Sequence, residues 1–255
     1  MSREAERLMA FLSGRSVPID AIDESGWNRI IDLARAHGVA QMLPACWKAN
    51  GTVPTPASDR VQAILLASAG RNIRLFHELE IIVRAFHAAG ITVVPLKGAW
   101  LAESVYANIA QRTMTDVDLW VRRNELDAAR RVMACLGYMS RPKGDRPQEL
   151  QDALTGETQF FKANAPMVEL HWNIFSGEWL RHTTHIDEQS IWERTLPYKG
   201  EDVRKLAPED AILHLCVHLA VNHQMSLTGV RTLLDLDLAR QRWDIDWSTV
   251  AQRAI

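Results

Sequence analysis

The chain has 255 residues, of which 47% are hydrophobic and 24% are charged. This composition is close to the globular average and excludes disorder over most of the length, collagen-like repeats and disulfide scaffolds. Its 29 basic and 31 acidic side chains give a net charge of −2, so binding to nucleic acid through a general positive field is not expected. At roughly 150 residues per domain, the length allows one large domain or two small ones.

Three cysteines, Cys46, Cys135 and Cys216, lie far apart and form no CxxC pair. This pattern is typical of free buried thiols in a reducing compartment and predicts a cytoplasmic protein. No segment has the roughly 20 apolar residues of a membrane span, and the charged N-terminus is unlike a secretory signal. The chain stops inside an expected helix that includes residues 246–253, which predicts a truncated chain or a ragged helix end.

The N-terminal part is expected to be helical. Apolar residues recur at helical spacing over residues 4–12, 25–49 and 59–89, the last of which predicts one long helix. A glycine and two prolines within residues 51–56 indicate a connector before this helix. Gly90 stands where a C-terminal cap belongs.

From residue 91 onward, short β-branched runs alternate with helical patterns. Expected strands cover residues 91–96, 116–121, 158–162 and 167–172, and the last two form a hairpin. Expected helices cover residues 99–106, 124–136 with Asn124 as cap, 208–222 and 230–240. The order predicts an α/β (α+β) chain with a helical part at 1–70, an α/β core at 71–175 and a helical part at 176–255.

The sharpest local feature is the run TDVDLWV at residues 115–121. Side chains alternate along a strand, so Asp116 and Asp118 share one face with their Cα atoms about 6.6 Å apart. Two carboxylates this close repel each other unless a cation lies between them, and hard oxygen ligands suit Mg²⁺. A pair of solvated aspartates in a turn before the strand is the alternative.

Two further patterns flank this run. Upstream, Lys97 and Gly98 lead from a strand into a helix, where a glycine and unpaired N–H groups let a phosphate approach the backbone. Downstream, Glu169 and His171 share one face of the expected strand 167–172, and a third carboxylate on a neighbouring strand would complete a metal site. An ordinary strand-to-helix turn and a solvent-facing glutamate are the alternatives.

In combination these motifs resemble a known family. The residues that carry the resemblance are Leu96-Lys97-Gly98, Tyr106, Arg112 to Val121 with both aspartates, Leu136-Gly137-Tyr138, Glu169 to Trp172, His214, His218 and Arg231 to Asp235. Together, over roughly residues 30 to 250, they resemble the uncharacterised nucleotidyltransferase family of the DNA polymerase β-like nucleotidyltransferase superfamily.

The resemblance implies a small mixed β-sheet flanked by helices, and carboxylates that bind two Mg²⁺ ions carrying a nucleoside triphosphate. One ion would activate the attacking oxygen and the other would neutralise the leaving pyrophosphate in an in-line displacement at the α-phosphorus. The implied catalytic and metal-binding residues are Asp116, Asp118 and Glu169, and the implied nucleotide-binding residues are Lys97, Gly98 and Arg112.

The implied function is Mg²⁺-dependent transfer of a nucleoside monophosphate, AMP from ATP, to a hydroxyl or phosphate of a small molecule or peptide. Neither a membrane nor a nucleic acid is an expected partner. Many relatives place a serine after the glycine, whereas this chain has Ala99, and the third carboxylate is Glu169 rather than Asp. The alternative is therefore a catalytically decayed module of the same fold, antitoxin-like or partner-binding.

Two other groups of residues, a pair of histidines and three tryptophans, each allow a functional and a packing interpretation. His214 and His218 stand four apart on an expected helix, a spacing that allows a shared zinc ion in a metal hydrolase, although packing against the α/β unit is favoured. Trp172, Trp179 and Trp192 follow the third carboxylate and can stack on a base. Packing in the core is the favoured interpretation for these tryptophans as well.

Overall fold

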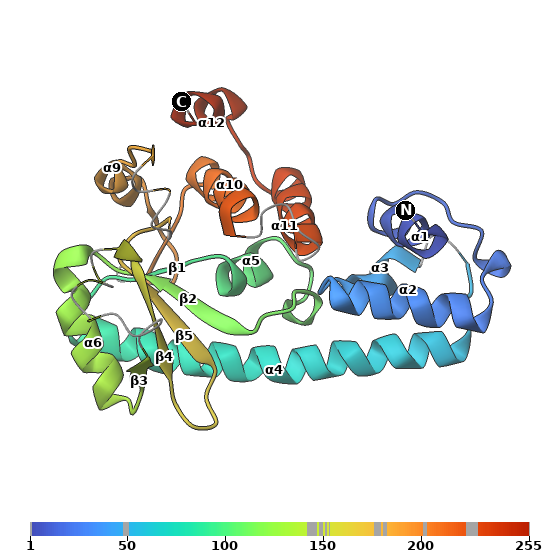
Figure 1. Cartoon of the computed structure of the whole chain (residues 1–255), viewed down its shortest axis with the longest axis horizontal. Helices are drawn as coiled ribbons and strands as arrows, with labels where there is room; N and C mark the ends of the chain where they lie inside the picture. The colour runs from blue at the N-terminus through green and yellow to red at the C-terminus, as the bar shows by residue number, and fades with distance from the viewer. Residues whose placement is uncertain are drawn as a thin grey trace.

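A computed structural model describes residues 2–47, 51–141, 147, 150, 152, 154–175, 180, 183–200, 203–222 and 229–254. Most of this chain is helical (Figure 1). The helices are α1 (Arg3–Leu12), α2 (Glu24–Ala36), α3 (Leu43–Trp47), α4 (Thr55–Ala88), α5 (Gly98–Ser104), α6 (Leu126–Cys135), α9 (Glu188–Glu193), α10 (Pro208–Val217), α11 (Gly229–Arg242) and α12 (Trp247–Arg253). The strands are β1 (Val94–Pro95), β2 (Asp116–Trp120), β3 (Met139–Arg141), β4 (Glu157–Phe161), β5 (Met167–His171), β6 (Leu196–Pro197) and β7 (Arg204–Lys205).

The first three helices form a small cluster of their own. Ser2 and Asp23 cap α1 and α2 by accepting hydrogen bonds from backbone N–H groups in the first turn of each helix. The apolar faces of the helices meet around Trp27, which stacks on Phe11 with ring centroids 6.0 Å apart. The cluster therefore has its own core, separate from the sheet.

The long helix α4 connects this cluster to the sheet (Figure 1). It begins after Pro54 and ends before Gly90, whose φ of +70° is the left-handed cap conformation expected from the sequence. Its first turns pack into the N-terminal cluster through Val61, and its last turns pack under the sheet through residues such as Phe86. The two parts thus share one continuous helix, and the division at residue 70 stays a prediction.

Five strands form one mixed sheet in the order β1-β2-β5-β4-β3. Strands β2 and β5 run parallel, and each remaining pair is antiparallel. This arrangement confirms the predicted α/β class with a small mixed sheet flanked by helices. Strands β4 and β5 form the expected hairpin, and the β2–β5 register sets Asp118 opposite Glu169.

The two faces of the sheet differ in chemistry. Apolar side chains from β2, β4 and β5 face α4 and α6 and form the main core. In β2, for example, Val117 and Leu119 are 2% and 0% exposed. Because side chains alternate along a strand, Asp118 and Glu169 lie on the opposite face, where they line a cavity with Gly98 of α5 and Leu215 of α10. The core therefore fixes which face carries the carboxylates.

Several local expectations were wrong. The strand expected at 91–96 is only Val94–Pro95, because the chain turns into α5 at Lys97. Asn124 does not cap α6, since a short 3₁₀ turn at Arg123–Glu125 precedes the helix and its N-cap is Glu125, which makes no capping hydrogen bond from its side chain. The helix expected to reach residue 222 changes to a π-helical turn at His218–Asn222.

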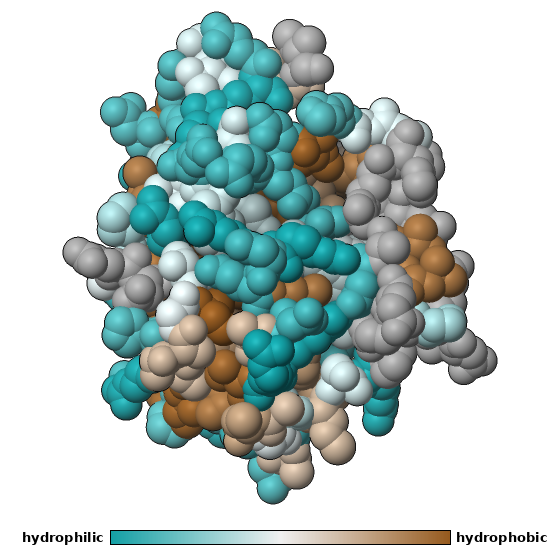
Figure 2. Space-filling model, turned by 90° about the vertical axis from the view of Figure 1, so that its left-hand side faces the viewer, coloured by the Kyte–Doolittle hydropathy of each residue, from teal (hydrophilic) through white to brown (hydrophobic). Residues whose placement is uncertain are grey.

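The surface brings two more findings. All three thiols are free, as expected, but Cys135 and Cys216 are exposed and Cys46 is half-buried, so the prediction of buried thiols was wrong. Figure 2 shows the face that carries α6 and α9, where hydrophilic side chains cover much of the upper part and apolar ones gather lower down. In the described part of the chain, no helix combines the length and the apolar character that crossing a membrane needs.

Candidate active site

The polar face of the sheet borders a cavity of about 240 Å³, which we call the acidic cavity. All six residues singled out in the sequence lie in its wall, beside others from the segment before β2 and from α10 and α11. The lining residues are Lys97, Gly98, Arg112, Thr113, Met114, Thr115, Asp116, Asp118, Glu169, Leu215, His218, Arg231, Thr232 and Asp235.

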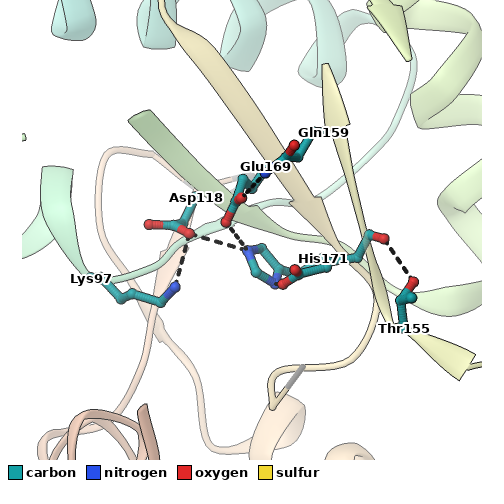
Figure 3. Close-up of polar contacts among 7 residues, drawn as sticks. Lys97, Asp118, Thr155, Gln159, Glu169 and His171 are labelled. Carbon is teal, nitrogen blue, oxygen red and sulfur yellow. Dashed lines mark hydrogen bonds and ion pairs between the residues drawn. The ribbon is translucent and has the colours of Figure 1, made fainter. Parts of the chain in front are cut away.

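Asp118 is the centre of the polar contacts in this cavity (Figure 3). Its side chain is 6% exposed, and one oxygen, Oδ1, accepts a hydrogen bond from Lys97 Nζ at 3.0 Å. The Nε2 atom of His171 lies 3.2 Å from the same oxygen. The carboxylate is therefore held from two sides, by the residue that precedes α5 and by the last residue of β5.

Glu169 is positioned by its own neighbours on the sheet. Gln159 in β4 donates a hydrogen bond from Nε2 to Glu169 Oε1 at 2.7 Å (Figure 3). The other oxygen, Oε2, lies 3.9 Å from His171 Nε2. The other ring nitrogen of His171, Nδ1, lies 3.3 Å from Glu157 Oε2. His171, buried to 1% exposure, thus lies among three carboxylates.

These contacts bring potential metal ligands close together. Within the described residues, one oxygen each of Asp118 and Glu169 and one nitrogen of His171 lie within 4.8 Å of one another. Asp116 shares the cavity wall but is outside this tightest group. A divalent cation is favoured where several carboxylates converge, because it relieves their mutual repulsion. The sequence had placed His171 on the correct face without assigning it to the site.

The two aspartates titrate in opposite directions. Burial, reinforced by the charges of Asp118 and Glu169, raises the pKa of Asp116 to about 6. Burial also acts to raise the pKa of Asp118, but Lys97 and His171 outweigh it and hold that pKa well below its usual value. Asp118 is therefore the permanent anion of the pair, whereas Asp116 gains a full charge only above about pH 6.

The backbone at Lys97 is strained. Lys97 has φ of +43° and ψ of −103°, a conformation that non-glycine residues rarely adopt and that costs about 1–3 kcal/mol. The next residue, Gly98, leaves little room: a Cβ added there would lie 3.2 Å from Arg112 Nη1 and 3.3 Å from Met114 Sδ. The strained turn directs the Lys97 ammonium group toward Asp118 and leaves Gly98 in the wall of the cavity.

Arg112 is engaged by a buried partner from α11. Its Nε and Nη2 atoms donate to the two carboxylate oxygens of Asp235 at 2.9 and 2.8 Å, and Tyr106 donates to the same carboxylate at 2.7 Å. Both charged side chains are almost fully buried. This pairing leaves Nη1 beside Gly98, so a role for Arg112 in holding a phosphate stays a prediction that rests on one nitrogen.

A second arginine of the cavity was not singled out as a site residue. Arg231, one helical turn before Asp235 on α11, lines the acidic cavity, and burial, with Arg112 nearby, lowers its pKa. Its Nη1 donates only a long 3.4 Å hydrogen bond to the Thr113 carbonyl, and its buried Nε has no hydrogen-bond partner among the described residues. The sequence signal was the spacing of Arg231 and Asp235, which places both side chains on one helix face.

His214 on α10 and His218 in the π-helical turn belong to no group of three potential metal ligands among the described residues. His214 is 4% exposed and packs on Phe175, with ring centroids 5.5 Å apart. Burial lowers its pKa to about 3, so the ring is neutral. His218 lies beside it and reaches the wall of the acidic cavity. Packing against the α/β unit, the favoured sequence interpretation of His214, is confirmed, and His223 lies outside the described residues.

The tryptophans also follow the packing interpretation. Trp172 is 1% exposed in the main core, and its Nε1 donates to the Asp152 carbonyl at 3.2 Å. Trp192 is 4% exposed and packs edge-on against Trp120. Trp179 lies outside the described residues. The two described rings are therefore held in the protein interior, where they cannot stack on a base in the acidic cavity.

A mixed sheet that places three carboxylates in the wall of one cavity, next to a Lys-Gly turn at a helix start, fits an enzyme of the nucleotidyl-transfer class. The chain belongs to the uncharacterised nucleotidyltransferase family, whose model matches residues 23–255. This match confirms the resemblance found in the sequence motifs. A comparison with curated proteins gives no match.

Two solved structures show a distant likeness. The solution structure of the antibiotic-resistance factor ANT(2'')-Ia is 12% identical, with a TM-score of 0.46 over 69% of this chain and 87% of that chain. The crystal structure of ANT(2'')-Ia in complex with adenylyl-2''-tobramycin is 12% identical, with a TM-score of 0.45 over 70% of this chain and 94% of that chain. Likeness this low identifies neither the site nor the acceptor of the present chain.

Proposed function

We propose that the protein transfers AMP from ATP, with Mg²⁺, to a hydroxyl or phosphate of a small molecule or peptide, and that it does so in the cytoplasm. The observation that carries this proposal is the register between β2 and β5, which sets Asp118 directly opposite Glu169 in the wall of the acidic cavity. Asp116 lines the same cavity. Family membership supports nucleotidyl transfer, and the donor, metal and acceptor are the proposed additions.

The residues present fit a magnesium site. Asp116, Asp118 and Glu169 offer carboxylate oxygens, the hard ligands that Mg²⁺ prefers. Among the described residues of the cavity wall, Lys97 and Arg231 balance only part of the charge of these three carboxylates, because Arg112 is paired with Asp235. We propose that the three carboxylates hold the metal. When bound, Mg²⁺ supplies positive charge for the phosphates and lowers the pKa of an attacking oxygen.

The chain's own groups carry the proton and orient the donor. Glu169, fixed by Gln159, is proposed to accept the proton of the acceptor hydroxyl. The hydroxyl oxygen then forms a bond to the α-phosphorus, and the bond from that phosphorus to the bridging oxygen breaks. The electron pair leaves with pyrophosphate, and AMP stays on the acceptor. For a phosphate acceptor, an anionic oxygen attacks and no proton is removed.

The cationic side of the cavity is proposed to bind the triphosphate. Gly98 lines the cavity at the start of α5, and the unpaired N–H groups of a helix N-terminus favour a phosphate. Lys97 adds charge, and Arg112 contributes through Nη1. Arg231 extends this group, because its buried Nε lacks a partner among the described residues. A volume of about 240 Å³ suits the phosphates and leaves the nucleoside to extend outward.

Ala99 bears on the alternative of a decayed binding module. Its side chain is 7% exposed and packs in the main core, so it does not line the acidic cavity. Because residue 99 is alanine, the chain lacks the serine hydroxyl that many relatives have at this position. It nevertheless retains Asp116, Asp118 and Glu169. This retention favours an active enzyme over a decayed module.

We also propose that the chain divides functionally as the sequence predicts, into parts at 1–70, 71–175 and 176–255. The middle part supplies the carboxylates, Lys97, Gly98 and Arg112. The last part supplies Arg231 and Asp235 from α11. The acidic cavity therefore needs the last two parts together.

The test is a thermal-shift titration of the full chain with the four common nucleoside triphosphates, with and without Mg²⁺. A ligand at 100 times its dissociation constant adds about 2.7 kcal/mol, which raises Tm by several degrees for a chain of this size. We expect ATP to give the largest shift, only with Mg²⁺, and the double variant Asp116→Asn/Asp118→Asn to lose it.

The matched control is Asp127→Asn, which removes one carboxylate that is 83% exposed on α6, outside the cavity. This variant should keep the full shift. An equal shift in the double aspartate variant would contradict the proposed metal site. Absence of any shift with all four triphosphates would favour the decayed module.

A further inference from the structure

A second cavity, of about 480 Å³, lies where α2 and α4 meet the segment that leads into β2. We call it the arginine pocket, because Arg35, Arg60 and Arg71 contribute to its wall together with Gln41 and Thr113. Among the described residues that line it, none is an aspartate or a glutamate. The pocket thus gathers positive charge in a chain whose overall net charge is −2.

The three arginines are not equally committed to partners. Arg60 donates hydrogen bonds to Asp32 and to Asn28. Arg71 is different: its Nε is buried and has no hydrogen-bond partner among the described residues. A buried guanidinium N–H without an acceptor is costly, and a carboxylate or phosphate oxygen is the group that satisfies it best. The pocket therefore favours an oxyanion.

Gln41 adds a second, independent requirement. Its side chain is 5% exposed, and its buried Oε1 has no donor among the described residues. An amide oxygen accepts hydrogen bonds and cannot be satisfied by an anion. It calls for an O–H or N–H donor on the ligand. Arg71 and Gln41, in the wall of the same pocket, therefore favour a ligand that carries an oxyanion and also a hydrogen-bond donor such as a hydroxyl.

The arginine pocket is fixed next to the acidic cavity. Thr113 lines both, and its Oγ1 donates to the Gly38 carbonyl at 3.1 Å, which ties the segment to the N-terminal cluster. Asn72, which follows Arg71 on α4, donates to the carbonyls of Ile109 and Arg112 at 2.6 and 2.8 Å. The helix α4 thus anchors the segment that ends in Thr113, and this residue belongs to the walls of both cavities.

We propose that the arginine pocket binds the anionic end of the acceptor, so that the acceptor is a hydroxylated phosphate or carboxylate. The binding of an oxyanion stands by itself, whereas its assignment to the acceptor rests on the proposed nucleotidyl transfer. The pocket disfavours a cationic acceptor by its charge, and the shared Thr113 places it beside the cavity that holds the carboxylates.

The first experiment measures equilibrium binding by calorimetry, without nucleotide and at constant ionic strength. The probes are inorganic phosphate and glycerol 3-phosphate, which adds hydroxyl groups to the same anion. We expect both to bind, glycerol 3-phosphate more tightly, and Arg71→Met to weaken each by about 10-fold or more, the range for a lost charge-assisted hydrogen bond. Arg71→Lys should keep part of the affinity, because it retains the charge but loses the planar fork.

Two variants control for net charge and for the other cavity. Arg74→Met removes an exposed arginine from the same helix and should leave both affinities unchanged. Lys97→Met reports on phosphate bound in the acidic cavity, and it should lower both affinities less than Arg71→Met does. Absence of phosphate binding, or a loss confined to Lys97→Met, would overturn the proposal. Each variant is first shown to melt cooperatively. A second test at the pocket is Gln41→Leu, which should lose only the preference for glycerol 3-phosphate over inorganic phosphate.

The second experiment tests the assignment to the acceptor. Pyrophosphate release from ATP and Mg²⁺ is measured with hydroxylated phosphates and with hydroxylated amines of similar size. We expect the phosphates alone to stimulate release, and Arg71→Met to raise the KM for them without changing the KM for ATP. Lack of stimulation by the phosphates, or displacement of inorganic phosphate from the Arg71-dependent site by ATP, would overturn this assignment. If the proposed nucleotidyl transfer is wrong but the arginine pocket does bind an oxyanion, calorimetry still detects phosphate binding that depends on Arg71.

Discussion

The acidic cavity and the arginine pocket share Thr113 in their walls but carry opposite imbalances of charge. In the acidic cavity, Arg112 is neutralised by Asp235, which leaves Lys97 and Arg231 against three carboxylates. In the arginine pocket, Arg60 has Asp32, whereas Arg71 has a buried N–H without an acceptor among the described residues. The difference teaches that buried pairs build the scaffold and that the unpaired charges beside them indicate what each cavity binds.

The largest effect is expected from removing the charge at the centre of the acidic cavity. Asp118→Asn should lower nucleotidyl transfer by about 10³-fold, because the side chain loses its charge for binding the metal and for the contact with Lys97. The check is the rate of pyrophosphate release at saturating ATP. Asp127→Asn should retain the full rate, and near-normal turnover by Asp118→Asn would remove the acidic cavity from the chemistry.

The next effect concerns the scaffold pair. Asp235→Ala should destabilise the fold by about 3 kcal/mol, because it leaves Arg112 charged and buried without a partner. Urea denaturation measures the free energy of unfolding. Asp237→Ala, on the exposed side of the same helix, should cost under about 0.5 kcal/mol. Equal costs for the two variants would show that the buried pair is not a scaffold element.

A smaller effect depends on pH. The pKa of Asp116 rises from its usual value of 3.8 to about 6 in the fold, so the folded state binds this proton more tightly than the unfolded state. The resulting stabilisation is complete below pH 3.8 and is lost as pH rises through 6. Asp116→Asn should therefore raise Tm by a few degrees at pH 7.5, without metal, and leave it almost unchanged at pH 4.

The measurement is a series of melting curves from pH 4 to pH 8 for both proteins. A difference in Tm that shrinks as pH rises would contradict the raised pKa of Asp116. In the wild type, the Mg²⁺-dependent shift with ATP should also decline below about pH 6, because protonation removes one carboxylate charge.

The smallest effect is expected at the turn beside the cavity. Gly98→Ala adds a Cβ that must displace Arg112 Nη1 and Met114 Sδ by a few tenths of an ångström, at a cost of about 1 kcal/mol. Gly70→Ala, on α4 where nothing lies within 4 Å of an added Cβ, should instead stabilise the helix by up to about 1 kcal/mol. Thermal unfolding of both variants measures these two changes in stability. No loss of stability in Gly98→Ala would show that the turn relaxes without cost.

Local pattern was sufficient to predict part of the site. The alternation in Asp116–Trp120 and Met167–His171 placed the carboxylates on one face of each strand, because the period of two is a property of the strand itself. The glycine at 90 marked the end of α4 for an equally local reason, its left-handed backbone. Asn124 failed as a cap because a 3₁₀ turn, which no periodicity signals, came first.

The sequence by itself determined the α/β class, the family motifs and three acidic residues of the cavity, Asp116, Asp118 and Glu169, since these follow from short-range periodicity and from the resemblance of the motifs to the family. Only the tertiary structure decided which groups meet: Asp235 pairs with Arg112 across 123 positions of chain, and His171 lies between Asp118 and Glu157. The arginine pocket is likewise assembled from two helices and a distant loop. Such contacts depend on how the helices pack around the sheet, and no local pattern encodes that packing.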